Sequence, residues 1–265
     1  MGPEKEHDYF NGMTLPVFKS HYSLGRSILT LLNEEDDDRI KPASIIKLCK
    51  KNDFKKLCLV EDSMSGFLEA YINSKEAGIE LMFGLRLSIC PDMNEKDEES
   101  VKNSSKYIVF CLNSDGYKDL IKIHDLASKD GFYYKPRIDF KNLKKLWTNN
   151  LKLCVPFYDS FIHNNILLGG VSIPEFDFTK STVFFTEDNG LPFDDLLLEG
   201  VSSFADSEGH EVVQTKSIFY ENKEDFKAYL TFRCINNRST LNKPQLEHMT
   251  SDEFCLESWK EQNAN

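Results

Sequence analysis

The sequence contains no long apolar stretch, no paired-cysteine motif and no excess of positive charge. None of its 265 residues falls in a run approaching the 18 apolar residues that a membrane-spanning helix needs. Residues 1–10 are charged and lack the apolar centre of a signal peptide. The formal net charge of −11 argues against a protein whose whole surface binds nucleic-acid phosphates. A local basic patch could still contact nucleic acid. These absences predict a cytoplasmic, acidic protein that binds other proteins.

The seven cysteines form no Cys-x-x-Cys pair, and their number is odd. Most of them lie in apolar runs such as Leu57-Cys58-Leu59-Val60. This pattern is typical of small buried side chains in a reducing compartment. Neither a disulfide framework nor a cysteine zinc site is therefore expected.

Familiar catalytic motifs are also missing. The six histidines include no His-x-His or His-x₃-His pair, Gly169-Gly170 indicates only a turn, and no Gly-x-Ser-x-Gly elbow occurs. The acidic run 34–38 is most simply a solvated loop, because nothing fixes its geometry for a metal. Glu61-Asp62 and Glu187-Asp188 follow expected strands and remain acid–base candidates, although most loop carboxylates are merely solvated.

What the sequence does contain is ample core material, with 40% apolar residues and 20 phenylalanines. Short apolar runs alternate with amphipathic segments and predict an α/β fold with a largely parallel sheet, in which functional residues gather at the C-terminal strand ends. Strands are expected at residues 15–18, 56–60, 79–89, 107–112, 152–157, 182–185 and 211–214. Helices are expected at residues 42–49, 67–77, 116–128 and 224–236, with a charged loop at 92–105 and Gly78 as a C-cap.

One segment resembles a known family. Phe132-Tyr133-Tyr134-Lys135-Pro136-Arg137-Ile138-Asp139 is similar to an element of the PHP (polymerase and histidinol phosphatase) domain of bacterial replicative DNA polymerase III alpha subunits. Other similar elements follow the family's order, at residues 21–24, 77–84, 113–120, 188–192 and 249–254. The resemblance implies a distorted seven-stranded β/α barrel at residues 15–258, between a flexible segment at 1–14 and a tail at 259–265.

The resemblance also implies a metal cluster in active members, and this sequence departs from it at the ligand positions. The turn that carries a cysteine in the family aligns with Pro156-Phe157-Tyr158, and only Glu61, with Asp62 beside it, keeps a ligand chemistry. The former metal-ligand positions are Val17, Lys19, Glu61, Asp62, Arg86, Ser217 and Phe219.

Two of these substitutions place positive charge where metal ions would bind. Lys19 and Arg86 are expected to form salt bridges with Glu61 and Asp62 that replace ions and ligands together, although both could instead face solvent. We therefore expect no metal, no cofactor and no catalytic residues.

The function implied by the resemblance is that of a non-catalytic binding platform in DNA replication. Its expected partners are replication proteins, namely the polymerase or a proofreading exonuclease subunit, with DNA reached through a partner and no membrane contact. A free-standing module of this kind suits a virus or mobile element. Two alternatives are a metal-dependent phosphoesterase or 3′–5′ exonuclease rebuilt around Glu61, Asp62, Glu187 and Asp188, and an inhibitor that mimics the host polymerase domain.

The binding candidates interleave aromatic and basic side chains. Three explanations fit such a pattern: packing against the barrel, a protein-contact hot spot, or stacking on single-stranded DNA. The candidates are Phe132, Tyr133, Tyr134, Lys135 and Arg137.

Overall fold

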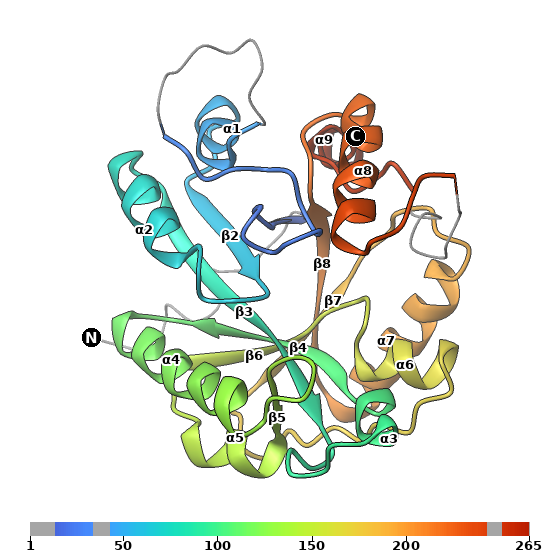
Figure 1. Cartoon of the computed structure of the whole chain (residues 1–265). Helices are drawn as coiled ribbons and strands as arrows, with labels where there is room; N and C mark the ends of the chain where they lie inside the picture. The colour runs from blue at the N-terminus through green and yellow to red at the C-terminus, as the bar shows by residue number, and fades with distance from the viewer. Residues whose placement is uncertain (1–13, 34–42, 243–250, 265) are drawn as a thin grey trace.

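The computed structural model describes residues 14–33, 43–242 and 251–264, and its central feature is a closed barrel of seven strands (Figure 1). The pairings run from β1 through β8, β7, β6, β4 and β3 to β2, and β2 returns to β1. The barrel strands are β1 (Leu15–Phe18), β2 (Lys56–Glu61), β3 (Glu80–Cys90), β4 (Ser105–Cys111), β6 (Leu151–Val155), β7 (Thr182–Thr186) and β8 (Glu211–Ile218). The expected seven-stranded β/α barrel is confirmed.

Strand β4 distorts this barrel because it runs antiparallel to both of its neighbours, β3 and β6. The other pairings in the ring are parallel. The first residues of β4 therefore lie at the end of the barrel where the other six strands finish. A short strand, β5 (Arg137–Asp139), pairs with the last residues of β3 outside the ring.

Side chains alternate between two apolar layers along each strand, as the two-residue period of a strand requires. On β2, Cys58 and Val60 point into the barrel, where they meet Met82, Phe110 and other residues of a small inner cluster. Leu57 and Leu59 point outward into the larger cluster beneath the helices. This outer layer fixes the barrel from outside and leaves one end of its interior for the site.

The helices lie around the outside of the barrel (Figure 1). They are α1 (Ile45–Lys51), α2 (Phe67–Glu76), α3 (Glu98–Lys102), α4 (Ser114–Lys129), α5 (Phe140–Leu146), α6 (Phe161–Leu167), α7 (Asp194–Glu208), the 3₁₀ turn η1 (Lys223–Asp225), α8 (Phe226–Asn236) and α9 (Leu256–Asn263). No helix in the described ranges is both long and apolar enough to cross a membrane. The cytoplasmic location stays a prediction.

Local expectations from the sequence mostly agree with these elements. All seven cysteines are free, and six of them are buried, as predicted. Gly78 follows α2 with a φ of 70°, the left-handed conformation expected after a helix C-terminus. The loop predicted at 92–105 was wrong in part, because Asp97 accepts a hydrogen bond from the Ser100 backbone N–H and starts helix α3.

The structure describes the C-terminal limit of the expected domain, but only the last residue of the segment before its N-terminal limit. Residues 1–13, the acidic run 34–38 and part of the element at 249–254 lie outside the described residues. The segment expected as a tail begins within α9, where Trp259 is buried and donates from its indole Nε1 to the Thr14 carbonyl at 2.8 Å. The limits of the domain at residues 15 and 258 stay a prediction.

Candidate functional site

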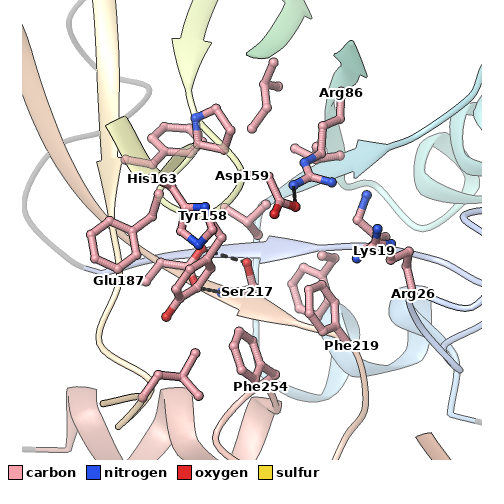
Figure 2. A pocket seen from close by; sticks show the side chains of 18 of the residues that line it. Lys19, Arg26, Arg86, Tyr158, Asp159, His163, Glu187, Ser217, Phe219 and Phe254 are labelled. Atoms are coloured by element: carbon pink, nitrogen blue, oxygen red, sulfur yellow. Dashed lines mark hydrogen bonds and ion pairs between the residues drawn. The ribbon is translucent and has the colours of Figure 1, made fainter. Parts of the chain in front are cut away.

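The candidate site lies at the barrel end where the parallel strands finish. A cavity of about 220 Å³ opens there, and Figure 2 shows its lining side chains. Lys19 follows β1, Arg86 stands within the long β3, and Phe219 follows β8. Five of the seven former ligand positions line this cavity, namely Val17, Lys19, Arg86, Ser217 and Phe219.

Four charged side chains of this site form one connected chain. Lys19 Nζ lies 3.2 Å from Asp62 Oδ1, and Arg86 Nη1 lies 3.7 Å from the same oxygen. Arg86 Nη2 then donates to Asp159 Oδ2 at 2.5 Å. The Lys19 and Arg86 side chains are only 8% and 10% exposed, so neither faces solvent. We refer to Lys19, Asp62, Arg86 and Asp159 as the ion-pair chain.

The pKa values of three members of the ion-pair chain are lowered, for different reasons. Burial opposes ionisation of Asp62, but Lys19 and Arg86 outweigh it and hold the pKa of Asp62 well below its usual range. Burial likewise opposes ionisation of Asp159, and Arg86 reverses this, so the pKa of Asp159 is also low. Burial lowers the pKa of Lys19, an effect that the charge of Asp62 partly offsets. Both carboxylates are therefore ionised at neutral pH.

Glu61 takes no part in this chain, although the sequence suggested that it would. Its fully buried carboxylate accepts the Ser20 backbone N–H at 2.9 Å and the hydroxyl of Ser23. Burial raises the pKa of Glu61, while the charge of Lys19 opposes that rise. Glu61 thus anchors the loop after β1, and Asp159 is the second carboxylate of the network in its place.

Asp159 was missed by the sequence analysis. It follows Pro156-Phe157-Tyr158 after β6, and its φ is 60°, a left-handed conformation that non-glycine residues seldom adopt. The available signal was a carboxylate just beyond the C-terminal end of a predicted strand. Figure 2 shows its side chain beside Arg86.

The opposite wall of the cavity holds a separate carboxylate. Glu187 accepts from Ser217 Oγ at 2.7 Å and from the Ser217 backbone N–H at 3.0 Å (Figure 2). Asn189 Nδ2 donates to the same carboxylate at 3.0 Å. Its neighbour Asp188 does not line the cavity, and its backbone carbonyl accepts from Lys216 Nζ. The Glu187 carboxylate is thus held by local hydrogen bonds, and the Asp188 carboxylate accepts from the Gly190 backbone N–H at 3.2 Å.

Aromatic rings line the side of the cavity next to β8. Phe219, at a former ligand position, stacks on Phe254 with ring centroids 5.5 Å apart and an interplanar angle of 6°. The Tyr158 hydroxyl donates to Asp194 Oδ1 at 2.9 Å, and this hydrogen bond fixes the position of the ring. This side of the cavity offers ring faces where a metal cluster would need oxygen, nitrogen or sulfur donors.

Comparison with known proteins agrees with this architecture. The model of the PHP domain family matches residues 36–170, about half of the chain. The chain belongs to the PHP domain family.

This PHP-family chain is similar to polymerase subunits from several bacteria. DNA polymerase III subunit alpha of Borreliella burgdorferi is 24% identical over 246 residues, covering 85% of this chain and 20% of the relative. The subunit of the same name from Helicobacter pylori 26695 is 27% identical over 222 residues, covering 75% of this chain and 18% of the relative. That of Aquifex aeolicus is 24% identical over 222 residues, 78% of this chain and 19% of the relative. The chain spans about a fifth of the length of these relatives.

The residues of this PHP barrel do not fit the metal cluster that the family resemblance implies. Within the described ranges, no group of three or more His, Cys, Asp and Glu side chains is placed to hold a metal ion. Asp62 is engaged by two cationic groups, while Glu61 and Glu187 are each hydrogen-bonded to a serine elsewhere. Arg86 and Lys19 bring positive charge into the space that cations would need. No catalytic step through a metal follows from this geometry.

A second cavity of about 180 Å³ adjoins the ion-pair chain and is strongly basic. It shares Arg26 and Arg86 with the first cavity, and Lys106, Lys135 and Asp62 also line it. Burial, together with the neighbouring charge of Arg86, lowers the pKa of Lys106 to about 7. Neither Arg26 nor Lys106 was singled out from the sequence.

The segment from Phe132 to Arg137 divides between surface and interior. Phe132 is 48% exposed and Tyr134 is 83% exposed, whereas Arg137 is fully buried. The Arg137 guanidinium donates to Ser100 Oγ at 2.6 Å and lies over the Tyr133 ring. Arg137 and Tyr133 therefore serve packing, which leaves Phe132, Tyr134 and Lys135 accessible for binding.

Proposed function

We propose that this PHP-family chain is a non-catalytic binding platform in DNA replication. The observation that carries the proposal is the ion-pair chain, in which Lys19 and Arg86 neutralise Asp62 and Asp159 at the end of the barrel where the family resemblance implies metals. An arrangement that satisfies its own charges has no need of a metal for folding. The similarity to DNA polymerase III alpha subunits along most of the chain supports a role in replication.

The expected partners are the polymerase or its proofreading exonuclease subunit, with DNA reached through them. The exposed rings of Phe132 and Tyr134 offer a contact point, because large aromatic side chains contribute much of the binding energy in protein interfaces. Tyr134 also has a φ of 57°, so its backbone holds an uncommon conformation at the tip of the loop. We propose this tip as the docking point.

Purified replication subunits from the organism that encodes the chain provide the test. We expect one of them to bind with a Kd near or below ~1 μM, and Phe132→Ala with Tyr134→Ala to weaken binding at least about tenfold. Ile173→Ala is the matched control, because Ile173 is 82% exposed but lies on the loop before β7. Titration calorimetry gives both values. Failure of both subunits to bind would reject the platform, and unchanged binding by the double variant would reject the docking point.

Hydrolysis assays separate this proposal from a rebuilt phosphoesterase. With p-nitrophenyl phosphate or single-stranded DNA and Mn²⁺, we expect rates equal to those without protein, unchanged by EDTA. The reason is that the cationic side chains of the ion-pair chain disfavour a metal beside Asp62. Elemental analysis of the purified protein checks metal content independently. EDTA-sensitive hydrolysis that Glu61→Ala abolishes would instead establish an enzyme.

A further inference from the structure

The second cavity holds cationic side chains that the ion-pair chain leaves unpaired. Within the described part of the chain, Arg26, Lys106 and Lys135 form no ion pair and no side-chain hydrogen bond. Lys106 and Lys135 are only partly exposed, so water screens them less than surface lysines. Burial lowers the pKa of both lysines, and the nearby charge of Arg86 adds to the effect. Such crowding costs free energy that a bound anion would recover.

The local charge is far from balanced. Six lysine and arginine side chains line the two cavities, namely Lys19, Arg26, Arg86, Lys106, Lys135 and Arg233. Three carboxylates line the same cavities, namely Asp62, Asp159 and Glu187, which leaves an excess of three formal positive charges. This excess occurs in a chain whose formal net charge is −11. A local field opposite in sign to the whole molecule selects for an anionic ligand.

The fold brings these groups together from three separate elements. Arg26 lies in the loop after β1, Lys106 is the second residue of β4, and Lys135 precedes β5. Lys106 reaches this end of the barrel because β4 runs antiparallel to its neighbours. Lys135 arrives there because β5 extends the end of β3, where Arg137 pairs with Ser88. Convergence of this kind gives a bound group several donors at once.

We propose that the second cavity binds a phosphoryl group, held by Arg26, Lys106 and Lys135 without a metal ion. A phosphoryl group can carry up to two negative charges and so matches the charge excess, and guanidinium and ammonium groups suit its oxygens. A cavity of about 180 Å³ accommodates a tetrahedral oxyanion with water. None of the three residues stands at a former metal-ligand position. The inference is independent of whether the chain docks a replication protein.

Phosphate binding to the whole purified protein tests the site. With inorganic phosphate at pH 6.5, low ionic strength and EDTA present, we expect saturable binding at one site by ³¹P NMR or calorimetry. Lys106→Met and Lys135→Met should each weaken it by about 10- to 100-fold, because a charged donor is lost. Lys129→Met removes the same charge from an exposed ion pair with Asp125 on α4 and should leave binding unchanged.

Three results would overturn the proposal. They are no phosphate binding by the wild-type protein, equal weakening by the Lys129→Met control, and binding that EDTA abolishes. Circular dichroism of each variant verifies that it is folded. Because two different lysines are tested, a variant that fails to fold still leaves the other to decide.

The phosphoryl group could come from free phosphate or from the end of a nucleic-acid strand, and matched probes distinguish these sources. The probes are inorganic phosphate and one short oligonucleotide with either a 5′-phosphate or a 5′-hydroxyl. At least about tenfold tighter binding of the phosphorylated oligonucleotide than of phosphate, reduced by Tyr134→Ala, would assign a strand end. Similar affinities for both phosphate-bearing probes would assign free phosphate. Equal binding of both oligonucleotides, insensitive to Lys106→Met, would reject the site.

Discussion

The variant Asp62→Ala should unfold with a free energy about 2–4 kcal/mol below that of the wild-type protein at neutral pH. Among the residues that the structure describes, Asp62 is the one carboxylate that contacts both Lys19 and Arg86. Removing it leaves the Lys19 ammonium buried without this partner, while Arg86 keeps its ion pair with Asp159. An uncompensated charge in a partly buried place costs several kcal/mol. Urea unfolding followed by circular dichroism measures the difference.

A surface carboxylate gives the matched control. Asp115→Ala breaks an ion pair with Lys118 in which both side chains are more than two-thirds exposed, and it should change stability by at most about 0.5 kcal/mol. The double variant Lys19→Met with Asp62→Leu should recover at least ~1 kcal/mol relative to Asp62→Ala, because it removes the stranded charge as well. Wild-type stability of Asp62→Ala would show that the ion-pair chain does not stabilise this end of the barrel.

The same variant should respond differently to acid. Because the folded-state pKa of Asp62 lies below its unfolded value, its contribution is fully present above about pH 4 and is lost as pH falls further. Asp159 behaves in the same way. Burial raises its pKa, but nearby cations, chiefly Arg86, together lower the pKa by more. The loss of stability between about pH 5 and pH 2 should therefore be smaller in Asp62→Ala than in the wild-type protein.

The fold was predictable where a strand or helix shows its own period. Seven apolar runs located the barrel strands, although the run at 211–214 covers only the first half of β8, and α2 and α4 followed from their spacing. Helix α7 was not predicted, although Leu197, Val201 and Ala205 are buried at four-residue intervals. Gly200 and the neighbouring serines lower its helix propensity and obscure that pattern. Strand β5 has only three residues, too few to show a period.

The direction of β4 could not be predicted, because the side-chain pattern of a strand is the same in either orientation. That direction decides where Lys106 lies. The family resemblance identified the charged positions Lys19, Asp62 and Arg86. Neither Lys106 nor Asp159 was identified from the sequence. The sequence also assigned Glu61 to the wrong partners, since the choice between Arg86 and Ser23 depends on the path of the loop after β1. Residues aligned with known ligands were found, and residues brought in by topology were not.

The second large effect has the opposite sign. Lys106→Met should raise the free energy of unfolding by about 1–3 kcal/mol at pH 6.5 without phosphate. Methionine keeps an unbranched apolar side chain of similar length and removes a positive charge that is repelled by Arg86 and Lys135. The attraction of the lysine to Asp62 and Asp159 only partly offsets this repulsion and the cost of burial. Thermal unfolding of both proteins in phosphate-free buffer gives the difference, with Lys129→Met as the control for net charge.

The pH dependence of this gain identifies its cause. The folded-state pKa of Lys106 is about 7, below that of a lysine in the unfolded chain. The unfolded state therefore binds more protons between about pH 7 and pH 10, and wild-type stability from this group rises with pH across that window.

The advantage of Lys106→Met should be greatest below pH 7 and should vanish near pH 10. Phosphate should also shrink this advantage, because the anion binds the protein that keeps Lys106 more tightly and therefore stabilises it more. A variant less stable than wild type at pH 6.5 would show that the lysine is held for packing. A more stable variant that loses the anion would show that stability is sacrificed at this cavity for binding.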